Sequence, residues 1–122
     1  MCVDGARWVR QNVLAANPRA PLRVYAIWFD AYEGDERSRV DTSLLADPRV
    51  TQFWDDGKEA GRWYARTFTR PDDPEWIEWD AFFVYPPGPT WEDTGAQPER
   101  WGRTIVGKHD DLRDAVAKLI TK

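Results

Sequence analysis

Two apolar runs dominate the pattern of hydrophobic and polar positions along the chain. Residues 22–29 read Leu-Arg-Val-Tyr-Ala-Ile-Trp-Phe, and residues 79–85 read Trp-Asp-Ala-Phe-Phe-Val-Tyr. Both runs are rich in β-branched and aromatic residues and are long enough for a buried strand. The Pro-Pro-Gly-Pro stretch that follows the second run ends it, because proline cannot continue a strand ladder. Residues 50–54 and 103–107 predict two shorter strands.

Apolar residues recur at helical spacing between these runs. In the first helix this pattern consists of Ala6, Val9, Val13 and Ala16, and Asn17-Pro18 ends it. The helices predicted on this basis cover residues 4–16, 36–46, 58–68 and a final segment that starts at Asp110-Asp111.

The order of the predicted elements indicates a mixed α/β fold. Strands and helices alternate in the first half, which favours parallel pairing there. The last two strands follow each other directly, so we expect them to pair antiparallel. We predict one mixed sheet with helices on both faces, containing residues 22–29 and 79–85, in a single domain over residues 1–122.

Composition and charge narrow the classes of function. The chain has 122 residues, eight tryptophans and a net charge of −4, which argues against nucleic acid as a partner. No apolar run approaches the length of a membrane span, and residues 1–10 have no apolar signal core. We therefore expect a soluble, cytoplasmic protein with no membrane partner. The chain has one cysteine, Cys2, so it forms no internal disulfide.

Four segments resemble proteins of the thioredoxin-like fold. Cys2-Val-Asp-Gly-Ala before an amphipathic helix resembles the end of a C-x-x-C motif that opens the first helix. The other three segments resemble later parts of that fold, and they are residues 22–29, 47–55 and 79–88. The resemblance implies a thioredoxin-like mixed sheet flanked by helices and a thiol-disulfide redox or thiol-sensing function. On this resemblance the opening strand and the first cysteine of the motif are not present in this chain, either because the chain begins late relative to its relatives or because this member has lost them.

The chain departs from that family pattern in two places. If Cys2 is instead the first cysteine of the motif, Gly5 stands where the second would be. The cis-proline that usually precedes the third strand is also missing, since the residues there are Glu78-Trp79-Asp80. In the thioredoxin-like fold, the opening strand lies between the strand after the first helix and the closing pair of strands. Without it, the two halves of the sheet would keep unpaired edges. We therefore predict a homodimer, in which a second copy covers these edges.

Cys2 is the candidate catalytic residue. A cysteine at a helix N-terminus sees the positive end of the helix dipole, which lowers the thiol pKa and favours the thiolate. Its expected partners are protein thiols or disulfides, and no cofactor or metal is expected. The alternative is an exposed terminal thiol without a role. The single histidine, His109, and its neighbours Asp110 and Asp111 are better explained as the start and cap of a helix.

A second hypothesis makes the chain a non-catalytic binding module. Tryptophans gather around the Pro-rich connection of residues 76–101, and exposed aromatic rings beside prolines can bind extended ligands. The candidate binding residues are Trp76, Trp79, Trp91 and Trp101. The alternative is that these rings cover the core. The acid pairs Asp55-Asp56 and Asp72-Asp73 are expected to serve turns, which aspartate favours through its own backbone hydrogen bonds.

Overall fold

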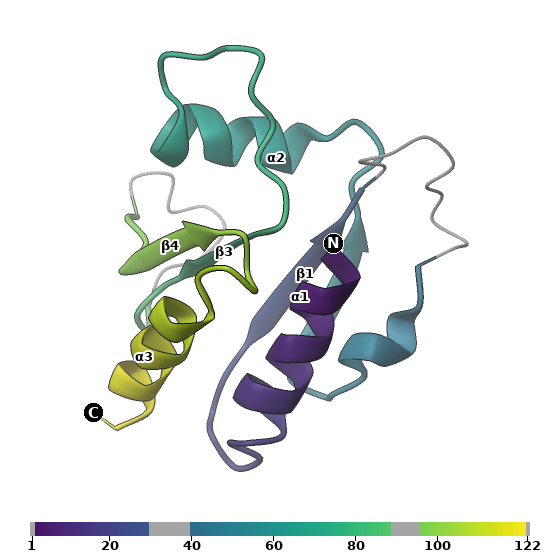
Figure 1. Ribbon diagram of the computed structural model, residues 1–122, viewed down its shortest axis with the longest axis vertical. Helices are drawn as coiled ribbons and strands as arrows, with labels where there is room; N and C mark the ends of the chain where they lie inside the picture. The colour runs from purple at the N-terminus through teal and green to yellow at the C-terminus, as the bar shows by residue number, and fades with distance from the viewer. Residues whose placement is uncertain (1, 30–39, 89–95, 122) are drawn as a thin grey trace. The chain divides into compact units, whose positions relative to one another are not determined.

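The computed structural model describes residues 2–29, 40–88 and 96–121 (Figure 1). The chain divides into two compact units. The first unit combines Met1–Ala20 with Asp80–Lys122, and the second consists of Pro21–Trp79. Each unit has its own two-stranded sheet, and each is described separately below.

The first unit places helices against a short β-hairpin. It contains the α-helix α1 (Cys2–Val9), its π-helical continuation η1 (Arg10–Leu14), the strands β3 (Ala81–Val84) and β4 (Arg100–Arg103), and the helix α3 (His109–Ile120). β3 and β4 pair antiparallel, with Ala81 opposite Arg103 and Val84 opposite Arg100. α3 packs against both strands and against η1 (Figure 1).

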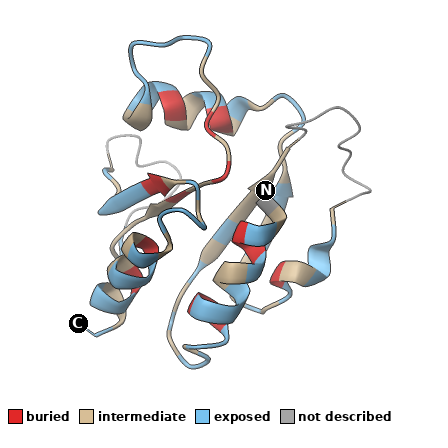
Figure 2. Cartoon of the chain, viewed as in Figure 1, coloured by how far each residue is buried: buried red, intermediate tan, exposed pale blue. Residues whose placement is uncertain are grey.

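Apolar side chains on one face of each helix form the core of this unit. Figure 2 shows buried positions on the helices and on β3. The buried apolar residues of the first unit are Ala6, Val13, Leu14, Phe82, Leu112 and Val116. Val13 and Leu14 lie in the π-helical segment η1. The helix predicted over residues 4–16 is therefore present over most of its length, but its hydrogen-bond geometry changes from α to π after Val9.

The second unit begins with a parallel pair of strands. It contains β1 (Val24–Trp28), the 3₁₀ helix η3 (Thr42–Leu45), β2 (Val50–Trp54), the α-helix α2 (Glu59–Tyr64) and its π-helical continuation η4 (Ala65–Thr69). Val24 pairs with Val50 and Trp28 with Trp54. After η4 the chain turns back along α2, where the N–H of Glu78 donates to the Gly61 carbonyl at 3.0 Å.

The two faces of the parallel pair differ in character. On one face the Trp28 indole N–H donates to the Gln52 side chain at 3.0 Å. On the other face Tyr25 and Phe53 stack with ring centroids 6.4 Å apart, and both are 44% exposed. Strands of parallel sheets are usually buried on both faces, so this aromatic pair is an unusual surface feature.

The structure confirms the mixed α/β class, the parallel pairing of the first two strands and the antiparallel pairing of the last two. The prediction that residues 22–29 and 79–85 share one sheet is wrong, because β1 and β3 lie in separate ladders. Of the predicted helix 36–46, residues 36–39 lie outside the described part, and the rest contains only η3. The thioredoxin-like arrangement remains a prediction.

The last strand lies three residues earlier than predicted, at Arg100–Arg103 instead of residues 103–107. The apolar residues Ile105 and Val106 occupy a turn between β4 and α3. Thr104 closes this turn, because its hydroxyl accepts from the Gly107 N–H at 3.0 Å and its carbonyl accepts from the Lys108 N–H at 2.9 Å. These local hydrogen bonds of Thr104 compete with the hydrogen bonds between β3 and β4, and β4 therefore ends at Arg103.

Candidate functional site

Cys2 is the first residue of α1, so the helix begins two residues earlier than the predicted start at Asp4. Its side chain lies outside the described part of the structure. The first turn of an α-helix carries backbone N–H groups without intrahelical partners, which together give a partial positive charge. The nearby Asp4 is exposed and forms an ion pair with Arg7 at 3.7 Å, one turn further along the helix.

Gly5 brings this first turn into close contact with the rest of the first unit. The residue is buried, and a Cβ placed on it would stand 3.0 Å from Ile105 Cβ and 3.2 Å from Asp80 Oδ1. A larger side chain would therefore push the turn away from these groups. Gly5 thus keeps the first turn of α1 packed directly on Asp80.

Asp80 is a buried carboxyl group directly before β3, with 9% of its surface exposed. Its backbone has a φ of 48°, in the left-handed region that aspartate tolerates better than most residues. Its Oδ1 accepts a long hydrogen bond of 3.4 Å from the Ile105 N–H. Asp80 belongs to the apolar run of residues 79–85, but nothing in the sequence predicts that its carboxyl group is buried, because aspartate is usually exposed.

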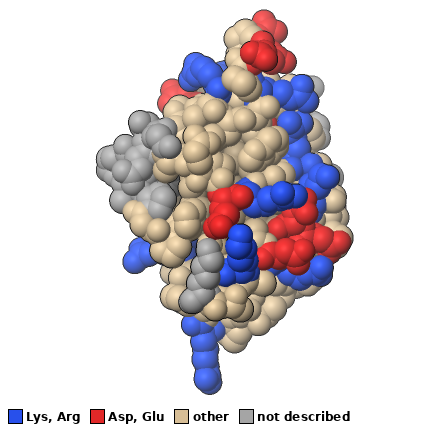
Figure 3. Space-filling view, turned by 90° about the vertical axis from the view of Figure 1, so that its left-hand side faces the viewer, with Lys and Arg blue, Asp and Glu red and all other residues tan. Residues whose placement is uncertain are grey.

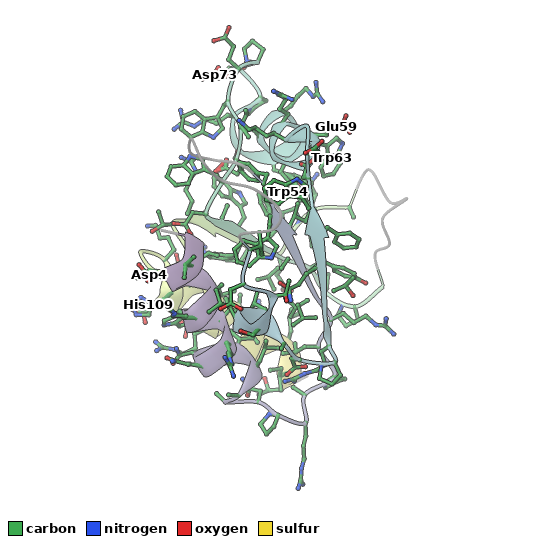
Figure 4. The ribbon with its side chains drawn as sticks, turned by 90° about the vertical axis from the view of Figure 1, so that its right-hand side faces the viewer. Asp4, Trp54, Glu59, Trp63, Asp73 and His109 are labelled. Carbon is green, nitrogen blue, oxygen red and sulfur yellow. The ribbon has the colours of Figure 1, made fainter. Side chains whose placement is uncertain are left out.

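His109 is the first residue of α3 and has a structural role. Its ring lies against the Trp8 ring of α1 at 5.5 Å between centroids, which joins the two helices (Figure 4). Its Nδ1 lies 2.7 Å from the Val106 carbonyl and its Nε2 lies 3.2 Å from Asp110. The helix cap predicted at Asp110-Asp111 is wrong, because the N-cap is Lys108 and both aspartates lie in the first turn, where they bind arginines.

The candidate tryptophans have different surroundings, and Trp91 lies outside the described residues. Trp76 and Trp79 belong to the second unit and Trp101 to the first. The Trp76 indole N–H donates to Glu78 Oε2 at 3.1 Å, and the Arg70 guanidinium lies 4.5 Å from the centre of its ring. Trp101 stacks on Phe83 at 6.3 Å and keeps 37% of its surface exposed. Trp101 is thus exposed, whereas Trp76 and Trp79 are half-buried.

The acid pairs serve turns, as predicted. Both oxygens of Asp55 accept backbone N–H bonds at the start of α2, from Glu59 at 3.0 Å and from Ala60 at 2.7 Å. The Asp73 side chain accepts from the Glu75 N–H at 3.1 Å in the loop after η4, where Figure 4 labels it. Within residues 2–29, 40–88 and 96–121, no three His, Cys, Asp or Glu side chains are arranged to hold a metal ion.

A basic pocket lies between β4 and the start of α3, and sequence analysis did not identify it. Its volume is about 480 Å³, and the described residues that line it are Arg100, Trp101, Gly102, Arg103, Lys108 and Asp111. Arg100 and Asp111 form an ion pair at 2.8 Å, and the bound guanidinium lowers the pKa of the Asp111 carboxyl. On the face shown in Figure 3, acidic and basic side chains lie next to one another.

The second unit also has a buried acid that the sequence did not reveal. Glu78 is 4% exposed, and its Oε2 accepts from the Thr69 hydroxyl at 2.5 Å as well as from Trp76. This side chain holds both ends of the loop formed by residues 70–77. It therefore has a structural role, and we assign no chemistry to it.

Within the described residues, no helix is both long and apolar enough to cross a bilayer. Comparison with protein-family models, with curated proteins and with solved structures gave no match for this chain.

Proposed function

We propose that the chain is a thiol-disulfide redox or thiol-sensing protein in which Cys2 is the reactive residue. The main support for this proposal is the position of Cys2 at the start of α1. The first turn of this helix is fixed by its packing against the rest of the first unit. Gly5 allows that turn to pack directly on Ile105 and Asp80, so the backbone N–H groups around Cys2 have a fixed orientation. Such preoriented N–H groups stabilise a thiolate.

The chemistry requires one thiolate and an external disulfide. The Cys2 sulfur attacks one sulfur of a disulfide RS–SR′, forms the bond Cys2–S–SR and releases R′S⁻ as the leaving group. Cys2 is the single cysteine of the chain, so a second thiol from outside must attack the mixed disulfide. That step returns the Cys2 thiolate and releases the disulfide of the two external thiols. The expected partners are protein thiols or disulfides and small thiols.

Two charges act on this thiol in opposite directions. The helix start favours the negative thiolate, whereas a negative charge on Asp80 disfavours it. Asp80 lies against Gly5 in the first turn of α1, so replacing it with asparagine should favour the thiolate further. Asparagine keeps the size of the side chain and also tolerates the left-handed backbone.

The rate of alkylation tests the proposal. Iodoacetamide labelling of the folded chain near pH 7 should be about threefold faster than labelling of the same chain in urea, because a thiol pKa about one unit lower raises the thiolate fraction more than it lowers nucleophilicity. The rate–pH profile should have its midpoint below about 8.5. Asp80→Asn should shift this midpoint further down, and Cys2→Ser should remove all labelling.

Incubation with oxidised glutathione provides a second measurement. The folded chain should gain one glutathione per molecule, and a reducing thiol should remove it. A folded chain that alkylates at the rate of the unfolded chain and forms no mixed disulfide would refute the proposal. The second hypothesis is a non-catalytic binding module that uses the Trp- and Pro-rich segment of residues 76–101.

A further inference from the structure

We propose that the contact between His109 and Trp8 is a pH-sensitive clasp between α3 and α1. The clasp holds the two helices together while the His109 ring is protonated, and it loosens when the ring loses its proton. Both helices belong to the first unit. The clasp does not involve the thiol of Cys2 and stands apart from the proposed redox chemistry.

Both ring nitrogens of His109 face hydrogen-bond acceptors. Nδ1 lies 2.7 Å from the Val106 carbonyl oxygen, and Nε2 lies 3.2 Å from Asp110 Oδ1. A neutral imidazole has one N–H donor and one nitrogen lone pair, whereas the imidazolium has two N–H donors. In either neutral tautomer a lone pair would point at an oxygen, so only the imidazolium satisfies both contacts. The geometry of this site is therefore that of the protonated ring.

The position of the His109 ring gives its charge a role in helix packing. The ring lies against the Trp8 indole of α1, with 5.5 Å between centroids and 53° between planes (Figure 4). A cation within about 6 Å of an indole centroid is attracted by the electrons of the ring. Protonation of His109 thus adds an electrostatic attraction between α3 and α1.

Charged side chains near the ring come from α1, from the residue before α3 and from α3 itself. They are Asp4 and Arg7, then Lys108, then Asp110 and Arg113. The two residues on α1 form an ion pair with each other at 3.7 Å. On α3, the Arg113 guanidinium binds the same oxygen of Asp110 as His109 does, at 2.6 Å. Asp110 therefore keeps a cationic partner when the His109 ring becomes neutral.

The two hydrogen bonds of the ring differ in how easily they are released. The Val106 carbonyl belongs to the backbone of the turn that Thr104 closes, so it stays in place. The Asp110 side chain is 67% exposed and already binds Arg113, so it can turn away from Nε2. We therefore expect the neutral ring to keep its proton on Nδ1, which is the minor tautomer of free histidine in water.

Nuclear magnetic resonance of the ¹⁵N-labelled chain tests the proposal, because His109 is the single histidine and its ring signals are unambiguous. A histidine in ordinary surroundings changes its charge between about pH 5 and 8. Across this range the ring signals should change from two protonated nitrogens to one proton on Nδ1. The Trp8 indole signal should move with the same pH dependence. The indole signal of Trp63, in the second unit, is the internal control and should not follow it.

Amide hydrogen exchange of α1, corrected for the intrinsic effect of pH, measures the clasp itself. Protection should be about two- to fivefold greater at the acidic end of the range, which is the factor expected from an exposed cation on an indole. His109→Gln and Trp8→Leu should each abolish this pH dependence. Lys118→Gln is the matched control, since it removes a positive charge near the other end of α3 and should retain the dependence.

Three results would overturn the proposal. The first is a neutral His109 ring with its proton on Nε2, and the second is a Trp8 indole signal that stays constant while His109 titrates. The third is a pH-dependent protection of α1 that persists in His109→Gln. The ring measurement uses the parent chain, so the proposal can fail even where a variant does not fold.

Discussion

Close backbone approaches at single residues determine how the second unit packs. Gly61 is buried in α2, and the chain that returns after η4 passes directly over it. A Cβ at this position would stand 2.7 Å from Ile77 Cγ2 and 2.8 Å from the Glu78 carbonyl oxygen. The second of these atoms belongs to the backbone, so a rotamer change offers no relief. The contact between α2 and this segment thus depends on the absence of a side chain.

We predict that Gly61→Ala lowers the free energy of unfolding by about 1–2 kcal/mol. Overpacking costs about 1–3 kcal/mol, and the better helix propensity of alanine returns up to about 1 kcal/mol of it. Urea unfolding followed by circular dichroism measures the change. Gly57→Ala is the control, because a Cβ there meets only the flexible Glu59 side chain, at 3.4 Å. Equal stability of both variants would contradict the prediction.

The sequence could not reveal the residues that shape both candidate sites. Cys2 and Trp101 were predicted because their residue types have a specific chemistry. Asp80 was missed because its importance depends on burial and a positive φ, which are tertiary properties. Arg100, Arg103 and Lys108 were missed because the first two stand at the two ends of β4 and the third is the N-cap residue of α3, so no run of basic residues marks the pocket.

At the scale of elements, local signals determined which predictions succeeded. The strand predicted over residues 50–54 has these bounds in the structure, because its apolar residues lie between Pro48 and an aspartate-glycine turn. β4 was misplaced because Arg100–Arg103 contains two arginines and a glycine, whereas the apolar Ile105 and Val106 lie in the following turn. The placement of residues 22–29 and 79–85 in one sheet was mispredicted because the hydrophobicity of a run indicates burial and carries no information on which sheet it joins.

An ion pair between neighbouring residues defines the start of β2. Asp47 Oδ1 accepts from the backbone N–H of Arg49 at 2.9 Å and from its Nε at 3.0 Å, and Oδ2 accepts from the guanidinium at 2.9 Å. These hydrogen bonds from Arg49 lower the pKa of Asp47 from 3.8 to about 2. A carboxyl whose pKa is lower in the folded state stabilises the fold while it is ionised.

We predict that Asp47→Asn is less stable than the parent chain near pH 5 and that this difference shrinks as the pH falls towards about 2. The contribution of Asp47 is complete above its unfolded pKa of 3.8 and is lost as the carboxyl protonates near pH 2. Urea midpoints of both proteins across this pH range measure the effect. Asp72→Asn removes a carboxylate outside this ion pair and is the control. A difference that stays constant with pH would contradict the prediction.

At the scale of the whole molecule, the described strands form two ladders of two strands each. A two-stranded sheet has an outer backbone edge on each strand, and such edges commonly pair with another chain. One unit contributes a parallel ladder with exposed aromatic rings, and the other contributes an antiparallel hairpin. The homodimer expected from the sequence stays a prediction.

We predict that the chain associates to a dimer, because pairing of edges across a two-fold axis satisfies backbone groups on both copies at once. Sedimentation over an approximately tenfold range of concentration should give a mass above that of one chain, rising with concentration. The same measurement in denaturant supplies the mass of the single chain. A species with the mass of one chain at every concentration would show that the chain does not need a second copy.

The buried Glu78 has a consequence for how the second unit can change during evolution or by engineering. Its carboxylate ties Thr69 to the far end of the loop, and Arg70 on Trp76 adds a second link across the base. Residues 71–75 are exposed beyond these links. With the ends already joined, each doubling of loop length costs only about 0.6 kcal/mol of closure entropy. The tip can therefore accept an inserted peptide, such as an affinity tag or a displayed epitope, while α2 keeps its packing.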